Sequence, residues 1–266
     1  MQLLLAFLTR DYLTQTSYRT AFLFSFVGIF FRAFIFFFIA QLIGPGASPY
    51  LDEVGGDYFP FVLLGLAFNS YFGIGLNAFA NSIRQAQMTG TLEAMLMTPT
   101  PVGLIVIGSA GWSYLFTTLQ VVVYFLIGIA LGIDISGASW GIALICLVLA
   151  IIAFAAIGII AASLIMVIKR GDPITSLIGS LSALFGGVYY PIEILPQPLQ
   201  LVSHLLPVTY ALRVIRQALL VGTTFQGVAG DLGILLLFCI VLVPISLMIF
   251  RFAVNRARTE GTLAQY

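Results

Sequence analysis

Residues 140–168 read WGIALICLVLAIIAFAAIGIIAASLIMVI, an apolar run that contains no charged side chain. A transmembrane helix needs about 20 consecutive apolar residues to cross a hydrocarbon core about 30 Å thick. Five further segments also satisfy this requirement: 20–43, 58–82, 103–132, 173–190 and 228–250. The sequence therefore predicts an all-α integral membrane protein with six transmembrane helices.

The composition of the whole chain excludes an ordinary soluble protein. Of the 266 residues, 61% are hydrophobic and 8% are charged, whereas soluble domains are about half apolar and about a quarter charged. The surplus of apolar side chains must face lipid, because a globule of this size cannot bury it. The net charge of +1 also provides no basic field for nucleic acid.

The positions of the basic residues predict the orientation of the chain. With a cytoplasmic N-terminus, the inner loops and tails hold eight of the eleven basic residues: Arg10, Arg19, Arg84, Lys169, Arg170, Arg251, Arg256 and Arg258. The positive-inside rule favours this arrangement, and an even number of spans makes both termini cytoplasmic. Three arginines do not follow the pattern, since Arg32 lies in the middle of the first span and Arg213 and Arg216 lie in a predicted outer stretch.

The residues before the first span predict a helix that lies in the inner membrane interface. Leu4, Leu8 and Tyr12 recur every four residues among polar side chains, a spacing that creates one apolar face. A cytoplasmic extension of the first span is the alternative. No small-residue cleavage site follows, so we expect no removable signal peptide. We expect an interface helix over residues 1–19 and one membrane domain over residues 20–266.

The chain lacks the motifs of common catalytic sites. Its single lysine, Lys169, is preceded by AASLIMVI, so the glycine-rich phosphate loop that ends in Gly-Lys-Ser/Thr is missing. No Gly-x-Ser-x-Gly elbow accompanies the single histidine, His204, although pairing with a distant serine stays open. His204, Cys146 and Cys239 together cannot complete a structural zinc site. We expect no enzyme activity and no bound cofactor or metal in this chain.

The inner loop between the second and third spans contains a short amphipathic segment. Gly90 and Thr91 open it, Glu93 favours its first helical turn through the helix dipole, and Pro99 helps to end it. Three- and four-residue spacing places its apolar side chains on one face: Leu92, Met95 and Leu96. Such a helix either docks on a partner protein or rests on the bilayer, and the residues alone do not decide between the two.

Two spans carry polar side chains that rarely face lipid. The second span has a stripe of small and polar residues at four-residue steps: Gly65, Asn69, Gly73, Asn77 and Asn81. This stripe favours close helix packing, with the lining of a substrate path as the alternative. Near mid-bilayer, Arg32 costs at least about 2.5 kcal/mol unless it is paired or hydrated. It either contacts an anionic headgroup or is a structural pair or a snorkelling side chain. Arg32, Asn69 and Asn77 are thus the candidate residues of a translocation path.

The fifth predicted span is followed by a stretch that prolines divide into short pieces: Pro191, Pro196, Pro198 and Pro207. Non-helical backbone at membrane depth is tolerated only where protein or water covers it. This allows a re-entrant outer hairpin that gates an exit, although the residues alone slightly favour a simple extracellular loop packed on the headgroups. The candidate gate residues are Tyr189, Tyr190, Pro191, Glu193 and Arg216.

Together these segments resemble the type-2 permeases of ABC exporters, which are membrane subunits that work with separate ATPase subunits. The similarity covers nearly the whole chain. Its most specific parts are Gly90-Thr91-Leu92-Glu93 followed by Pro99, and GVYYPIEILP of residues 187–196 leading to LPVTYAL of residues 206–212 and Arg216. The resemblance implies a coupling helix at the first inner loop, an N-terminal helix along the membrane interface, and short re-entrant helices after Pro191.

The resemblance also implies the function of a permease subunit of an ATP-driven exporter in the cell (inner) membrane. Two permease copies, expected to be identical, would enclose the path of a lipophilic or lipid-linked substrate: an amphipathic drug, a lipid or a lipid-linked saccharide. ATP and Mg would bind to two copies of a cytosolic ATPase subunit.

Two other functions compete with the permease interpretation. An ion-coupled secondary transporter or channel would show carboxylates or broken helices at mid-bilayer, but no acidic residue lies centrally in any predicted span. An intramembrane enzyme would depend on His204, and its turnover would be lost when that residue is replaced by alanine. The permease interpretation predicts only mild effects of that replacement.

Overall fold

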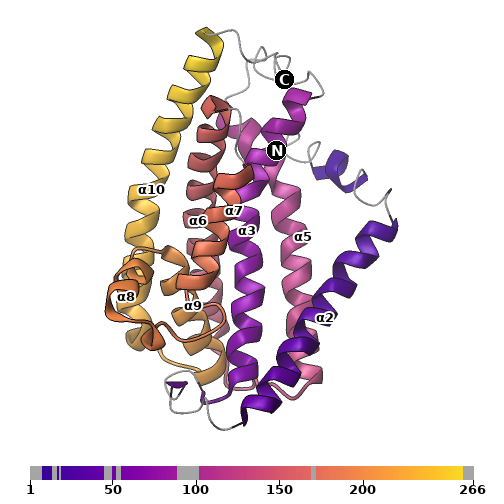
Figure 1. The fold of residues 1–266 in the computed structure, drawn as a ribbon, viewed down its shortest axis with the longest axis vertical. Coiled ribbons are helices and arrows are strands. Elements are labelled where there is room, and N and C mark those ends of the chain that lie inside the picture. Colours follow the sequence, from indigo (N-terminus) through magenta and orange to yellow (C-terminus); the bar gives the residue numbers. More distant parts are fainter. Residues whose placement is uncertain are drawn as a thin grey trace.

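The computed structural model consists of helices and the turns that join them (Figure 1). It describes residues 8–13, 17, 19–44, 50–51, 55–88, 102–168 and 172–259. This described part contains no β-strand, which confirms the predicted all-α class.

Five helices in the described residues are long and apolar enough to cross a membrane. Their membrane-length segments contain 21 to 32 residues, and a rise of about 1.5 Å per residue makes each of them about 30 Å long or longer. The helices are α2 (Arg19–Ile43), α3 (Tyr58–Met88), α5 (Val102–Ala130), α6 (Trp140–Ile168) and α10 (Phe225–Thr259). They correspond to the first four predicted spans and the sixth.

The fifth predicted span, 173–190, is shorter in the structure. Helix α7 (Asp172–Phe185) has 14 residues, about 21 Å at 1.5 Å per residue, whereas the hydrocarbon core needs about 30 Å. The helix ends before Gly186 and Gly187 because Gly187 adopts a left-handed conformation with φ 77°, which favours glycine. Six complete spans are therefore not confirmed, since α7 alone is too short to cross.

Short pieces of helix follow α7 and lie in the lower half of the molecule in Figure 1. Proline occupies the first turn of both longer pieces, where its missing N–H has no helical partner. The longest piece, α9, contacts α3, α6 and α10. The pieces are η3 (Ile192–Ile194), α8 (Gln197–His204), α9 (Pro207–Arg216) and the π-helical turn η4 (Gln217–Val221).

Helix α3 lies at the centre of the bundle. Its membrane-length segment is 72% buried, whereas that of α2 is 11% buried. Tyr71 and Phe72 of α3 are among the largest fully buried side chains. At the contact with α6, a Cβ on Gly158 would lie 1.6 Å from the Gly75 carbonyl oxygen. The two central helices therefore approach more closely than any larger residue at position 158 would permit.

The α5–α6 loop and the end of η4 meet at one end of the bundle. The backbone N–H of Ser139 donates to the Ala218 carbonyl (2.8 Å), and the Ser139 hydroxyl donates to the Thr223 carbonyl (3.1 Å). Gly222 has φ 70°, and a Cβ there would lie 2.3 Å from the Gly137 carbonyl oxygen. The chain after α9 therefore reaches the end of the bundle that lies opposite the last turn of α10 (Figure 1).

Residues 8–13 are helical and lie against the first half of α5. The rings of Tyr12 and Trp112 meet edge to face with centroids 5.3 Å apart, and Leu8 lies beside Gly111. This contact places the N-terminal helical residues at the end of α5 that is predicted to be cytoplasmic. Their location in the membrane interface stays a prediction.

Candidate functional site

The residues predicted to couple the chain to an ATPase lie outside the described residues. The helices that flank this segment, α3 and α5, end at Met88 and begin at Val102. Both of these helix ends lie at the end of the bundle opposite the α5–α6 loop (Figure 1). The residues concerned are Gly90, Thr91, Leu92, Glu93, Met95, Leu96 and Pro99.

Arg216, the last residue of α9, joins three parts of the fold. Its side chain is buried (4% exposed), and each guanidinium nitrogen donates to a different carbonyl oxygen. Nε binds Phe61 of α3 (3.1 Å), Nη1 binds Gly187 (2.8 Å) and Nη2 binds Val188 (3.1 Å). The guanidinium carbon also lies 3.4 Å from the centroid of the Phe61 ring. Arg216 thus ties α9 to α3 and to the break that follows α7.

Arginine suits this position because its planar guanidinium offers five N–H donors in a fixed arrangement. The guanidinium of arginine is always protonated in proteins, so a full positive charge is buried at this position. The three carbonyl dipoles and the face of the Phe61 ring stabilise the buried charge.

Gly65 of α3 makes room for the Arg216 side chain. A Cβ at this position would lie 2.1 Å from the Val188 carbonyl oxygen and 2.7 Å from Nη2 of Arg216. Only glycine lets the backbone of α3 come this close to both groups. At this end, the small-and-polar stripe of the second span is therefore a packing surface.

The other stripe residues named as path candidates, Asn69 and Asn77, are half-buried on α3. The Asn77 amide nitrogen donates to the carbonyl of Gly73 within its own helix (2.9 Å). Among the described residues, no hydrogen bond joins these two amides to Arg32 of α2. A role for Asn69 and Asn77 in a path stays a prediction.

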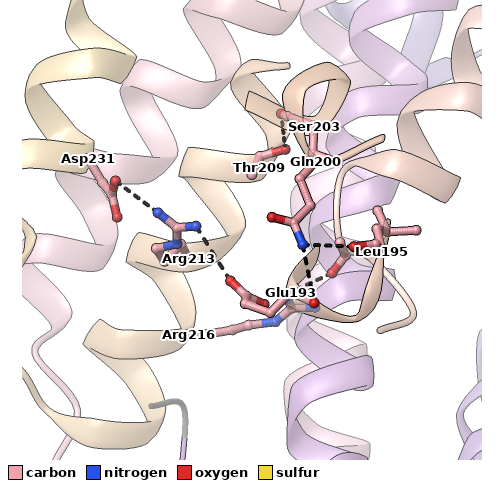
Figure 2. Close-up of polar contacts among 9 residues, drawn as sticks. Glu193, Leu195, Gln200, Ser203, Thr209, Arg213, Arg216 and Asp231 are labelled. Carbon is pink, nitrogen blue, oxygen red and sulfur yellow. Dashed lines mark hydrogen bonds and ion pairs between the residues drawn. The ribbon is translucent and has the colours of Figure 1, made fainter. Parts of the chain in front are cut away.

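Arg213 lies one turn before Arg216 and bridges two carboxylates (Figure 2). Its Nη2 lies 3.7 Å from Oε1 of Glu193, and its Nη1 lies 3.5 Å from Oδ1 of Asp231 in α10. The Asp231 side chain is 18% exposed and that of Glu193 is 59% exposed, so water screens the Asp231 pair less. No spacing in the sequence points to Asp231, because its partner belongs to another helix.

The predicted gate residues come together around the turn between α7 and η3. The Tyr189 ring stacks on Phe36 of α2 with centroids 5.8 Å apart, and its carbonyl accepts a hydrogen bond from the Tyr58 hydroxyl (3.1 Å). The Tyr190 hydroxyl donates to the Leu184 carbonyl near the end of α7 (2.6 Å). These contacts fix the turn against α2, α3 and α7.

The short helices that follow are held together by their own polar side chains (Figure 2). Pro191 precedes η3 in an extended conformation. The Gln200 amide then donates to the Leu195 carbonyl (2.7 Å), and the Thr209 hydroxyl donates to the Ser203 carbonyl (2.7 Å). These bonds satisfy carbonyls where the helices are interrupted. Among the predicted gate residues, Glu193 connects η3 to Arg213 of α9.

Arg32 lies on α2, one turn before Phe36, and its side chain is exposed. Tyr124 of α5 is 1% exposed, and its hydroxyl lies beside the Arg32 guanidinium, which interacts with it by charge and by a side-chain hydrogen bond. No pattern in the sequence distinguishes Tyr124 from the packing aromatics of its span.

The two cysteines and the histidine take part in hydrogen bonds between helices or within the segment of short helices. The thiol of Cys146 donates to the Ala211 carbonyl (3.4 Å), and that of Cys239 to the Leu149 carbonyl (3.2 Å). The His204 carbonyl accepts a hydrogen bond from the Tyr210 hydroxyl (3.0 Å). Within the described ranges, no group of three His, Cys, Asp or Glu residues is placed to hold a metal ion.

The described residues form a bundle of five membrane-length helices, and a series of short helices connects α6 to α10. This architecture defines a multi-pass membrane protein. Residues 2–220 match the family of the ABC-2 type transporter. The chain therefore belongs to this family, whose members are the membrane permease components of ABC transport systems and pair with an ABC ATPase subunit. The predicted resemblance is confirmed, and the family assigns transport rather than catalysis to this subunit.

One curated relative is nodulation protein J of Neorhizobium galegae. It is 28% identical to this chain over 222 residues, which cover 79% of this chain and 80% of that protein. The alignment therefore extends over most of the bundle and is not confined to a single motif.

Proposed function

We propose that this chain is the permease subunit of an ATP-driven exporter for lipophilic or lipid-linked substrates. Two copies of the chain enclose the path, and two copies of a cytosolic ATPase subunit bind ATP and Mg. The observation that supports this function most strongly is the family match over residues 2–220. The lack of a phosphate loop around the single lysine, Lys169, agrees with ATP hydrolysis in another subunit.

The segment from α7 to η4 supports a sixth membrane crossing that is made of two short helices rather than one long helix. Helix α7 starts at the end of the bundle that is predicted to be cytoplasmic, and η4 ends beside Ser139 at the opposite end. In our proposal α7 and α9 together form the fifth crossing, and η3 with α8 forms a re-entrant outer hairpin between them. Both termini are then cytoplasmic, in agreement with the positive-inside rule.

The surface of α2 supports a second copy of the chain. Only 11% of its membrane-length segment is buried, and Arg32 is exposed near the middle of that segment. An arginine at this depth needs protein or water around it. A path between two identical permeases provides both, and it leaves Arg32, Asn69 and Asn77 as its candidate polar residues.

Coupling to the ATPase is assigned to the inner loop between α3 and α5. Its apolar side chains Leu92, Met95 and Leu96 suit a groove on the partner, and methionine adapts to such surfaces. Nucleotide binding then shifts the balance between two arrangements of the membrane helices. The outer hairpin with Tyr189, Tyr190, Pro191, Glu193 and Arg216 acts as the gate on the far side.

The experiment is co-purification of the tagged chain with its ABC ATPase subunit, before and after deletion of residues 90–98. We expect the deletion to abolish recovery of the ATPase while the permease still elutes as a folded species. The substitution Met95→Asp tests the same contact with less disturbance, and Asp134→Asn in the outer α5–α6 loop is the matched control. Undiminished recovery of the ATPase with both loop variants would show that the docking role is wrong.

A further inference from the structure

Residues 193–202, which include most of η3 and α8, form a stretch without a buried residue. None of these ten residues is buried, whereas Pro191 and Ile192 before them and Ser203 after them are buried. We call residues 193–202 the strap. A segment with so little buried surface opens at a lower free-energy cost than the packed helices around it.

The strap is bonded to itself and is anchored at its far end (Figure 2). The Gln200 amide donates to the carbonyls of Leu195 (2.7 Å) and Glu193 (3.3 Å), so that η3 and α8 are tied to each other. The Thr209 hydroxyl of α9 donates to the Ser203 carbonyl (2.7 Å), which fixes the end of α8. The strap is therefore one unit that is attached to α9 where α8 ends.

At the near end of the strap, a single ion pair makes the connection to α9. Among the described residues, Glu193 is the strap residue whose side chain forms an ion pair with the rest of the fold. Its Oε1 lies 3.7 Å from Nη2 of Arg213, and its side chain is 59% exposed. This distance is too long for a hydrogen bond, and exposed ion pairs are weak. The connection is therefore one that a small shift of the helices can break.

The other nitrogen of the same guanidinium binds a carboxylate within the packed bundle. Nη1 of Arg213 lies 3.5 Å from Oδ1 of Asp231, whose side chain is 18% exposed. Helices α9 and α10, which carry these two residues, pack on each other, and the rings of Tyr210 and Phe238 meet with centroids 6.0 Å apart. Because the fork of donors serves each carboxylate with its own nitrogen, Asp231 and Glu193 do not compete for Arg213.

We propose that the Glu193–Arg213 pair is a latch that holds the strap against α9, and that Asp231 is a positioning residue for the Arg213 guanidinium. This inference rests on the proposed function, because it names the contact that regulates the outer gate of the permease. The Glu193 pair is the longer and more exposed of the two, so it breaks first. Arg213 then stays with Asp231 in a position to bind Glu193 again.

The test measures how often the strap leaves α9 in the full chain in lipid nanodiscs. Ile192, next to Glu193, is 6% exposed, so a thiol introduced by Ile192→Cys reacts with a water-soluble maleimide mainly when the strap is open. We expect Glu193→Gln and Arg213→Gln each to raise the reaction rate about threefold, the effect of losing a partly exposed ion pair. Combining the two substitutions should add nothing, because both remove the same pair.

The positioning role of Asp231 has its own readout. Asp231→Asn should raise the reaction rate of the thiol at position 192 about twofold, because the guanidinium is then held less firmly toward Glu193. In the Arg213→Gln background the same substitution should have no effect, since Asp231 acts through Arg213. A rise that persists in that background would overturn the positioning role.

The chain offers two controls. Asp134→Asn removes a carboxylate from the α5–α6 loop and should leave the rate at position 192 unchanged. The native thiol of Cys146 is buried and donates to the Ala211 carbonyl of α9, so its reaction reports separation of α9 from α6. Peptide mass spectrometry distinguishes the two thiols. In the latch variants, the rate should rise at position 192 and stay constant at Cys146.

An unchanged rate at position 192 in Glu193→Gln and Arg213→Gln, or an equal rise at Cys146, would overturn the latch. With the ATPase subunit and ATP present, the rate of the chain with the intact pair should rise toward that of Glu193→Gln. No rise, although the ATPase is recovered with the chain, would overturn the regulatory role. The experiments without the ATPase judge the latch alone, whereas recovery of the ATPase after deletion of residues 90–98 judges the proposed function.

Discussion

At the scale of single residues, the largest effect is expected at Arg216, because one side chain completes contacts with three parts of the fold. Its three carbonyl partners belong to α3 and to the break after α7. A side chain that fills the same volume without donors would leave buried carbonyls without a partner. The arginine is therefore a stabilising residue of the proposed gate.

We predict that Arg216→Met destabilises the purified protein by about 3 kcal/mol or more, since it removes several charge-assisted hydrogen bonds at once. Arg216→Lys should be intermediate because an ammonium cannot reproduce the fork of donors. Thermal unfolding in detergent measures both effects. Arg213→Met is the control on the same helix, and it should lose less because Arg213 is 29% exposed. Equal losses at both positions would contradict the role assigned to Arg216.

Gly65→Ala tests the space beside that arginine. The new methyl group would meet the Val188 carbonyl and the Arg216 guanidinium, and we expect a loss of about 2 kcal/mol from overpacking. Gly73→Ala is the matched control on the same helix, because a Cβ at Gly73 has no atom within 4 Å. We expect no loss of stability there. Melting temperatures of the two variants measure the difference. Equal melting temperatures would contradict the close approach of Gly65 to Val188 and Arg216.

At the scale of elements, the spans differ in how far the sequence predicts them. The helices α2, α3, α5, α6 and α10 follow from local apolar runs longer than a bilayer requires. The end of α7 depends on Gly187 and on carbonyls that bind Arg216, which is 28 residues from Val188. No local pattern contains that contact, so the predicted span continued to residue 190.

The sequence predicts the residues of the candidate gate but not the helices against which they pack. Tyr189, Tyr190 and Glu193 are close in the sequence, Arg216 ends the same motif 23 residues later, and the structure places the four around one turn. Their packing against α2 and α3 follows from helices far away in the chain and has no local signal. The sequence also does not predict Asp231 and Tyr124, because the partner of each lies on another helix.

The link between η3 and α10 through Arg213 yields a prediction about elements. Asp231→Asn should destabilise the protein by about 1 kcal/mol, and Glu193→Gln by less, because the Glu193 carboxylate is far more exposed. A double-mutant cycle with Arg213→Met separates each pair energy from other effects. A larger coupling energy for Glu193 than for Asp231 would show that the hairpin is held mainly by the exposed pair.

At the scale of the whole molecule, the two ends of the bundle must face opposite sides of the membrane. Both native cysteines are buried, so introduced cysteines can report the orientation. We predict that a membrane-impermeant maleimide labels Ser136→Cys, in the α5–α6 loop, in intact cells. Arg10→Cys should react only after the membrane is permeabilised. The reverse pattern would invert the topology and place the coupling loop on the wrong side.

Reconstitution tests the central idea of a permease driven by a separate ATPase. The permease alone, the ATPase alone and both together are placed in proteoliposomes with a fluorescent lipid, and the movement of this lipid between leaflets is followed by quenching with dithionite. We predict ATP-dependent movement only when both subunits are present. Movement of the probe at the same rate by the permease alone, without ATP or the ATPase, would contradict the proposed function.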